Sequence, residues 1–204
     1  MEKSIEKSIE KRIDNFVKKV FNMWETLKGE YGIDQSIPLV IAPDNEFGKY
    51  KAIMLNSLFN VDHFKPNEFE NDDDSFATTT TYVGPDNNNM CHAFCAGTII
   101  NSRIIFKIVN KNAEEEMIDF IEIILRHEIG HMISVAIIYE GITTDESNAI
   151  DEKIKMVETD MYSKMNNNGS YEEYVDLPME AHANACANVD VKRLIELCYK
   201  FDQL

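Results

Sequence analysis

The chain has 204 residues, of which 44% are hydrophobic and 27% charged, a composition typical of a globular protein with one domain-sized core. Its formal net charge of −16 disfavours direct binding to nucleic acid or to an anionic membrane surface, because both attract basic proteins. No apolar run approaches the about 20 residues that cross a bilayer, and the N-terminus lacks an apolar signal core, so a cytoplasmic location is expected.

The N-terminal part of the chain predicts an amphipathic helix. Residues 3–28 carry apolar side chains at helical spacing, and Gly29 is expected to end the helix. We interpret residues 1–30 as a helix packed on a domain formed by residues 31–204. That domain is expected to begin with a strand at residues 37–41 and a helix at residues 51–59.

The middle of the chain predicts a small sheet. Residues 66–76, which contain three consecutive aspartates, look like a solvated loop whose spacing matches no standard calcium motif. Residues 78–83 favour a strand through β-branching. A hairpin is expected next, with strands at residues 93–100 and 103–109 and a turn at Asn101–Ser102.

Cys91, His92 and Cys95 lie at the start of this hairpin. Two cysteines and a histidine within five residues could hold a zinc ion, but no second Cys/His pair nearby completes four ligands. We therefore favour a packing role for them and leave a second metal site open. The four cysteines of the chain are expected to be reduced thiols.

The C-terminal half predicts helices, so the fold class is α+β with a small mixed sheet. Apolar periodicity, helix-breaking residues and a proline suited to a first helical turn define the elements. The expected segments are a helix at residues 113–139, a helix at 146–165, a loop at 166–170 and a last helix at 178–201.

His127, Glu128 and His131 form a His-Glu-x-x-His motif within the helix at residues 113–139. Two histidines four residues apart lie on one helical face, so both imidazoles can reach one metal ion while the glutamate stands beside its open position. The alternative is a pair of core histidines, which would need several buried hydrogen-bond partners. The motif predicts a zinc (Zn²⁺) site that hydrolyses peptide bonds.

A catalytic zinc needs a third protein ligand, and the last helix offers Glu180. Glu180 and Asn184 begin a row of otherwise apolar residues at spacings of three and four. Alternatively, an acid in a first helical turn is favoured by the helix dipole alone, but this does not explain an amide on a buried face. His182 competes as a ligand, yet it points about 200° away from Glu180 around the helix. We prefer Glu180.

These residues resemble a known family pattern. His127-Glu128-Ile129-Gly130-His131, followed by the run Glu180-Ala181-His182-Ala183-Asn184-Ala185-Cys186-Ala187, resembles the gluzincin metallopeptidases. The nearer similarity is to short cytosolic zincins of phages and mobile elements, including the ImmA/IrrE-type peptidases. The resemblance covers roughly residues 90–200 and implies a zincin-like fold, with an active-site helix and a C-terminal helix that carries the third zinc ligand.

The resemblance also implies residue roles. His127, His131 and Glu180 would bind zinc, Glu128 would be the catalytic base, and Asn184 would hydrogen-bond a ligating imidazole. Tyr171, Tyr174 and His182 are candidate oxyanion donors only because they lie near Glu180 in the sequence. By its position before the motif helix, the strand expected at residues 103–109 resembles the zincin edge strand that holds substrate.

The sequence thus predicts a zinc-dependent metallopeptidase that acts on peptides or proteins, without nucleic acid or membrane as a partner. One alternative is a metal-binding regulatory or anti-host factor that acts by binding another protein. A further alternative is a structural domain in which the pentapeptide is accidental.

Overall fold

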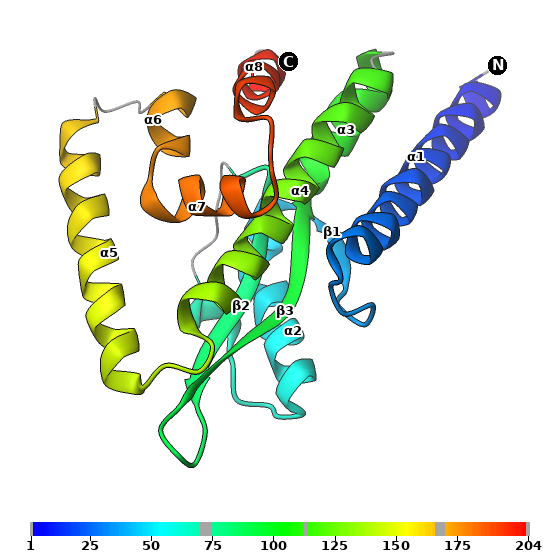
Figure 1. The fold of residues 1–204 in the computed structure, drawn as a ribbon. Coiled ribbons are helices and arrows are strands. Elements are labelled where there is room, and N and C mark those ends of the chain that lie inside the picture. The colour runs from blue at the N-terminus through cyan, green and yellow to red at the C-terminus, as the bar shows by residue number, and fades with distance from the viewer. Residues whose placement is uncertain (1, 70–74, 112–113, 166–169, 203–204) are drawn as a thin grey trace. The chain divides into compact units, whose positions relative to one another are not determined.

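A computed structural model describes residues 2–69, 75–111, 114–165 and 170–202, and the fold is α+β (Figure 1). Within these residues, eight α-helices accompany a small mixed sheet of three strands, which confirms the predicted fold class. The elements are α1 (Glu2–Tyr31), β1 (Leu39–Ala42), α2 (Phe47–Phe59), β2 (Ala77–Pro85), β3 (Cys91–Asn101), α3 (Ser102–Lys111), α4 (Glu114–Tyr139), α5 (Thr144–Lys164), α6 (Tyr171–Val175), α7 (Pro178–Cys186) and α8 (Val191–Asp202).

The chain divides into two compact units. Residues 1–80 and 96–125 form unit 1, and residues 81–95 and 126–204 form unit 2. Strands β2 and β3 and helix α4 contribute residues to both units. All residues of the predicted metal site belong to unit 2.

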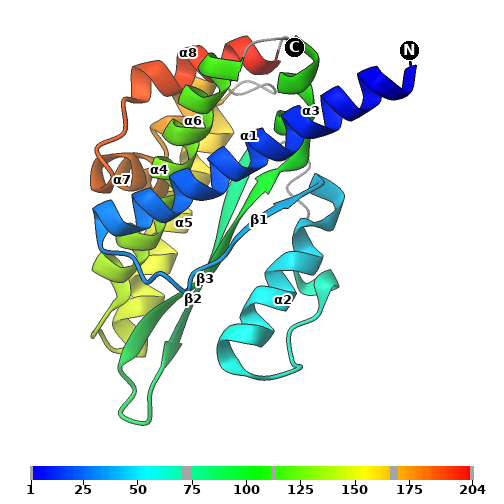
Figure 2. The same ribbon diagram turned by 90° about the vertical axis from the view of Figure 1, so that its right-hand side faces the viewer.

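The core of unit 1 lies around β1, β3 and α2. The sheet has the order β1-β3-β2, and β1 pairs with β3 in parallel, with Leu39 opposite Thr98 and Ala42 opposite Asn101 (Figure 2). Both strands are too apolar to face water, so side chains from α2 cover them. The buried cluster consists of Ala42, Phe47, Met54, Leu55, Ala96 and Ile99.

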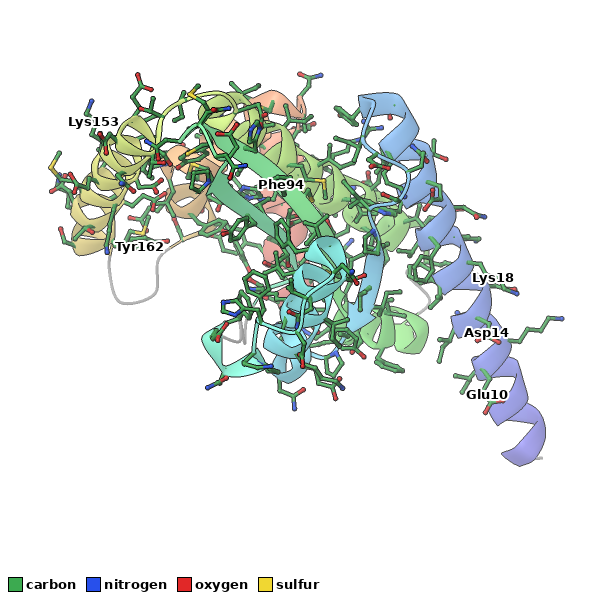
Figure 3. All side chains as sticks on the ribbon, turned by 90° about the horizontal axis from the view of Figure 1, so that it is seen from below. Glu10, Asp14, Lys18, Phe94, Lys153 and Tyr162 are labelled. Atoms are coloured by element: carbon green, nitrogen blue, oxygen red, sulfur yellow. The ribbon has the colours of Figure 1, made fainter. Side chains whose placement is uncertain are left out.

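Helix α1 is amphipathic, as predicted, and contacts α3 within unit 1. Its exposed side presents charged side chains that project from the ribbon, among them Glu10, Asp14 and Lys18 (Figure 3). The helix ends at Gly32, whose φ of 67° suits glycine, so Gly29 lies inside the helix and is not its stop. Its buried apolar side chains are spaced by three and four residues: Phe16, Val20, Trp24 and Leu27.

In unit 2 the β2–β3 turn is joined to the end of α4. Cys91 accepts a backbone hydrogen bond from Gly141 and donates one to Ile142. The Glu140 carboxylate accepts hydrogen bonds from the His92 ring and from the Ala93 backbone. These bonds fix the C-terminal end of α4, whose preceding turns carry the metal-site motif. Helix α7 contacts both α5 and α6, and α6 contacts α8.

Of the predicted hairpin, the first strand at residues 93–100 is confirmed within β3, but the turn at Asn101–Ser102 and the second strand at residues 103–109 are wrong. Residues 102–111 form α3, and β3 instead follows β2 after a turn at residues 86–90. Asn101 caps α3, because its side-chain oxygen accepts a hydrogen bond from the Arg103 amide, so the Asn-Ser pair begins a helix where we expected a turn. Ile104 and Ile105 are both buried, which strand alternation would not allow. The segment therefore cannot be the expected edge strand.

The predicted helix at residues 178–201 is two helices. Helix α7 ends at Cys186, Asn188 has a φ of 50°, and Asp190 caps α8 by accepting a hydrogen bond from the Arg193 amide. The apolar row that runs across both helices concealed this break. A short helix that we did not predict, α6, begins after Ser170, whose hydroxyl accepts a hydrogen bond from the Glu173 amide.

Of the loop predicted at residues 66–76, residues 70–74 lie outside the described residues, and Pro66–Glu68 form a short 3-10 helix. Of the loop predicted at residues 166–170, only Ser170 is described. Among the helices that are described, none combines the length and the apolar composition of a membrane span. The predicted strands at residues 37–41 and 78–83 and the helices at 51–59, 113–139 and 146–165 are confirmed, with boundaries that differ by a few residues.

Candidate metal centre

Helix α4 presents the two motif histidines on one face. His127 and His131 are separated by one helical turn, and their ring centroids lie 4.6 Å apart. The two Nε2 atoms are 3.1 Å apart, so both rings point toward the same place. His127 and Glu128 are buried, although both carry polar groups, and Ile129 beside them is fully buried. The motif thus lies where the helix enters the core of unit 2.

Helix α7 brings Glu180 to these histidines. Pro178 occupies the first turn of α7, so Glu180 stands at its N-terminal end, where the helix dipole favours a carboxylate. Glu180 Oε2 lies 3.0 Å from His127 Nε2 and 3.3 Å from His131 Nε2. Residues 127, 131 and 180 therefore converge, although α5 and α6 lie between them in the chain (Figure 1).

The spacing of these three atoms can be compared with that of zinc ligands. Nitrogen and oxygen ligands about 2.0–2.1 Å from a tetrahedral ion lie about 3.3 Å from one another. The three separations here are 3.0, 3.1 and 3.3 Å. Glu180 Oε2 is also buried, and both imidazole Nε2 atoms face it. A divalent cation between the three atoms would satisfy that oxygen, so the donor set fits zinc.

Asn184 contacts the His127 ring at Nδ1, the nitrogen on the side away from Glu180 and His131. The His127 Nδ1–H group donates to Asn184 Oδ1 over 2.8 Å, and Asn184 is only 3% exposed. This bond leaves the lone pair on Nε2, which is the nitrogen that faces Glu180. The role that the resemblance implied for Asn184 thus has the geometry that it requires.

The electrostatics of the site favour a positive charge. Burial lowers the pKa of His127, but the hydrogen bond to Glu180 and the charges of Glu128 and Glu180 outweigh it and raise that pKa to about 9. Burial raises the pKa of Glu180, but the hydrogen bonds and charges of His127 and His131 lower it to about 2. The carboxylate is therefore ionised at neutral pH and stabilises the positive charge of either a protonated His127 or a metal cation.

Tyr174 of α6 lies beside the same carboxylates. The residue is 44% exposed, and its hydroxyl lies near enough to Glu180 and Glu128 for their charges to act on it. Burial of the hydroxyl, together with the negative charges of Glu180 and Glu128, raises the pKa of Tyr174 well above its ordinary value. This hydroxyl is therefore protonated at neutral pH and can donate to an oxyanion.

The other two candidate donors point elsewhere. Tyr171 donates a hydrogen bond to Asp202 and lies against the Tyr199 ring. His182 Nδ1 lies 2.5 Å from the Ser134 hydroxyl, on the flank of α7 away from Glu180. Of the three candidate donors, Tyr174 is thus the one that the structure brings to the cluster.

The Cys91/His92/Cys95 segment makes no metal cluster among the described residues. The two His92 nitrogens face different carboxylates, Glu140 at 2.8 Å and Asp86 at 3.6 Å, so they do not converge on one point. Cys91 is buried, and none of the four cysteines of the chain forms a disulfide. Packing accounts for this segment.

Three residues around the site were not predicted from the sequence. A Cβ on Gly130 would stand 2.1 Å from the Ala183 carbonyl oxygen, so glycine lets α4 and α7 approach. Ser134 is the hydroxyl that binds His182. Tyr162 of α5 lies near enough to Glu180 for that charge to raise its pKa, after the larger effects of burial and Glu158. The glycine inside an apolar helix was a sequence signal for close helix packing. The sequence carried no such signal for Ser134 or Tyr162.

Comparisons of the chain with protein-family models, with curated protein sequences and with solved structures find no match.

Proposed function

We propose that this protein is a zinc-dependent peptidase of the gluzincin type, with a zincin-like arrangement of the motif helix α4 and the ligand helix α7. The observation that carries the proposal is the convergence of His127, His131 and Glu180 at ligand spacing, with the Glu128 carboxylate next to a ligand in the sequence. No other combination of side chains in the described residues offers three such ligand atoms.

The ligand set favours zinc and hydrolysis over a purely structural metal. Two imidazoles and one carboxylate are the ligands of several catalytic zinc sites, whereas structural sites usually close the coordination shell with a fourth protein ligand, often cysteine. In the part of the chain that the structure describes, the cluster has three members and no cysteine. A zinc site with three protein ligands keeps one coordination position of the metal for solvent.

The surrounding residues have roles that follow from their chemistry. A bound zinc supplies Lewis acidity, which makes water more acidic and polarises a peptide carbonyl. Glu128 would accept a proton from the attacking water and return it to the leaving amine. Asn184 would hold the His127 ring in its tautomer, and the Tyr174 hydroxyl would donate to the oxyanion.

The proposal is tested by metal analysis together with the substitution Glu128→Gln. The purified protein should contain about one zinc per chain, and it should cleave members of a mixed peptide library, with cleavage detected by mass spectrometry. Glu128→Gln should retain zinc but lose cleavage, because an amide cannot accept the proton. Glu115→Gln removes the same charge from an exposed first-turn position of α4 and should cleave like the natural chain.

The outcomes separate the candidate functions. Zinc retained with no cleavage by either form would contradict the peptidase and favour the metal-binding regulatory or anti-host role. Absence of zinc from the protein, even after addition of the ion, would leave the motif as an accidental feature of a structural domain.

A further inference from the structure

The contact between α4 and α7 includes a polar pair outside the three candidate ligands and Asn184. Ser134 Oγ of α4 and His182 Nδ1 of α7 lie 2.5 Å apart. Ser134 is fully buried, and His182 is half-buried. Neither side chain reaches the ligand cluster, so this pair can act on it only through the two helices.

The pair extends an ordered series of contacts along α4. His127, His131 and Ser134 are spaced by four and three residues, so they share the face of α4 that meets α7. His127 contacts Asn184, and His131 contacts Glu180. The next turn of α4 carries Ser134, which binds α7 on its flank.

The rotation of α7 about its own axis also depends on the Asn184–His127 bond and on the Ala183 backbone against Gly130, and both lie on its buried face rather than on its flank. The helix has nine residues, and its buried side chains are Ala183 and Asn184. Its N-cap residue, Leu177, makes no side-chain capping bond. A small apolar face allows a helix to turn with little loss of contact, so a polar bond on the flank has a large share in setting the angle.

A small rotation of α7 would displace the Glu180 carboxylate from the metal site. A carboxylate about 6 Å from a helix axis moves by about 1 Å when the helix turns by about 10°. Metal–ligand distances tolerate only about 0.2 Å of error. The direction of the Glu180 carboxylate thus depends on how firmly α7 is held.

We propose that Ser134 and His182 are positioning residues for Glu180: their hydrogen bond fixes the rotation of α7 and so aims the Glu180 carboxylate at the point where the two imidazoles converge. The inference rests on the metal site of the proposed function but not on peptidase activity. A bond that only supported the fold would change stability and leave metal coordination as it was.

The experiment measures zinc affinity, cobalt coordination and metal-free stability for four single variants and for the Ser134→Ala/His182→Ala double variant. Zinc affinity is measured by competition with a coloured chelator, the coordination geometry by the visible absorption of the cobalt form, and stability by thermal unfolding in a chelator. The variants are Ser134→Ala, His182→Ala, His182→Asn and Ser147→Ala. Ser147→Ala is the matched control, since Ser147 is a buried serine on α5.

Ser134→Ala should lower zinc affinity about tenfold, at the lower end of the effect of residues that orient ligands. The alanine leaves no unpaired polar atom at position 134, and water can reach the half-buried His182, so metal-free stability should change little. His182→Ala should give the same loss, and the double variant should lose no more than either single variant. His182→Asn keeps a polar atom near the Nδ1 position and should restore most of the affinity. The cobalt spectrum should change in the alanine variants alone.

Unchanged zinc affinity and cobalt spectrum in Ser134→Ala would overturn the inference, as would an equal loss in Ser147→Ala. A natural chain that binds neither zinc nor cobalt would overturn both the inference and the proposed function. A chain that binds zinc, responds to these variants and cleaves no peptide would contradict the peptidase alone.

Discussion

Gly130 of α4 lies against the Ala183 backbone of α7 so closely that a Cβ on residue 130 would stand 2.1 Å from the Ala183 carbonyl oxygen. No side-chain movement can relieve this overlap, because the obstructing atom belongs to the main chain. Only glycine therefore allows the helix that carries His127 and His131 to meet the helix that carries Glu180. The close approach of the two backbones is what makes the ligand spacing short.

Gly130→Ala should therefore separate the helices. We expect a loss of about 3 kcal/mol in the free energy of unfolding, typical of a severe overpacking, and loss of stoichiometric zinc binding. Gly29→Ala is the control, because an added Cβ there meets nothing within 4 Å. That variant should stabilise α1 by about 0.5–1 kcal/mol. Chemical denaturation and metal analysis measure both effects, and a Gly130→Ala protein with normal zinc content would contradict the packing argument.

Asn184→Ala should weaken zinc binding about 10–100-fold, because His127 loses the acceptor that orients its ring. Asn184→Asp keeps an oxygen at that position and should bind zinc much more tightly than the alanine variant. Competition with a chelator gives both affinities. Equal affinities for the two variants would show that the acceptor does not orient His127.

Tyr174→Phe should lower kcat by about 10²–10³-fold if its hydroxyl stabilises the oxyanion, while zinc affinity stays within a few-fold of the natural value. Tyr171→Phe is the matched control from the same helix. It removes a hydrogen bond to Asp202, at a cost in stability of about 1 kcal/mol, and should leave kcat unchanged. Steady-state kinetics on a cleaved library peptide compares them. Similar kcat values for both variants would remove Tyr174 from the mechanism.

As the pH rises from 6.5 to about 9, the stability of the metal-free protein should fall and its zinc affinity should rise. The raised pKa of His127, about 9 against an ordinary 6.5, stabilises the metal-free fold below pH 6.5, and this contribution is lost as the pH rises through 9. The lowered pKa of Glu180, about 2 against 4.5, stabilises the fold above pH 4.5, and this contribution is lost as the pH falls through 2. The pair thus contributes most between pH 4.5 and 6.5.

Zinc competes with the proton on His127, so its affinity should increase as the pH rises toward 9. Thermal unfolding is measured between pH 6.5 and 9, once in a chelator and once in excess zinc. The first series tests the stability of the metal-free fold, and the second tests zinc affinity. The metal-free Tm should fall as pH increases, while the increment from zinc grows. Glu180→Gln, which cannot carry the charge, should flatten the metal-free trend. A zinc increment that shrinks with rising pH would contradict the assignment of His127 as a ligand.

The errors in the predicted fold concern segments whose local composition suits more than one structure. Residues 102–111 are rich in β-branched side chains, and the Asn101 cap outweighed that preference. The break between α7 and α8 was hidden because apolar spacing continues across it, although Asn188 and Asp190 carry turn and capping signals. In each segment a single capping hydrogen bond, accepted by Asn101 or by Asp190, marks where a helix begins.

The sequence alone determined the parts of the site that depend on one helix. The spacing of His127 and His131 places two imidazoles on one face whatever the rest of the chain does, because the helical repeat is set by the backbone. Whether Glu180 meets them depends on the path of the chain through α5 and α6, which no local pattern specifies. Tertiary structure alone decided that convergence, through the approach at Gly130, and it alone turned His182 toward Ser134, because the packing of two helices depends on side chains far apart in sequence.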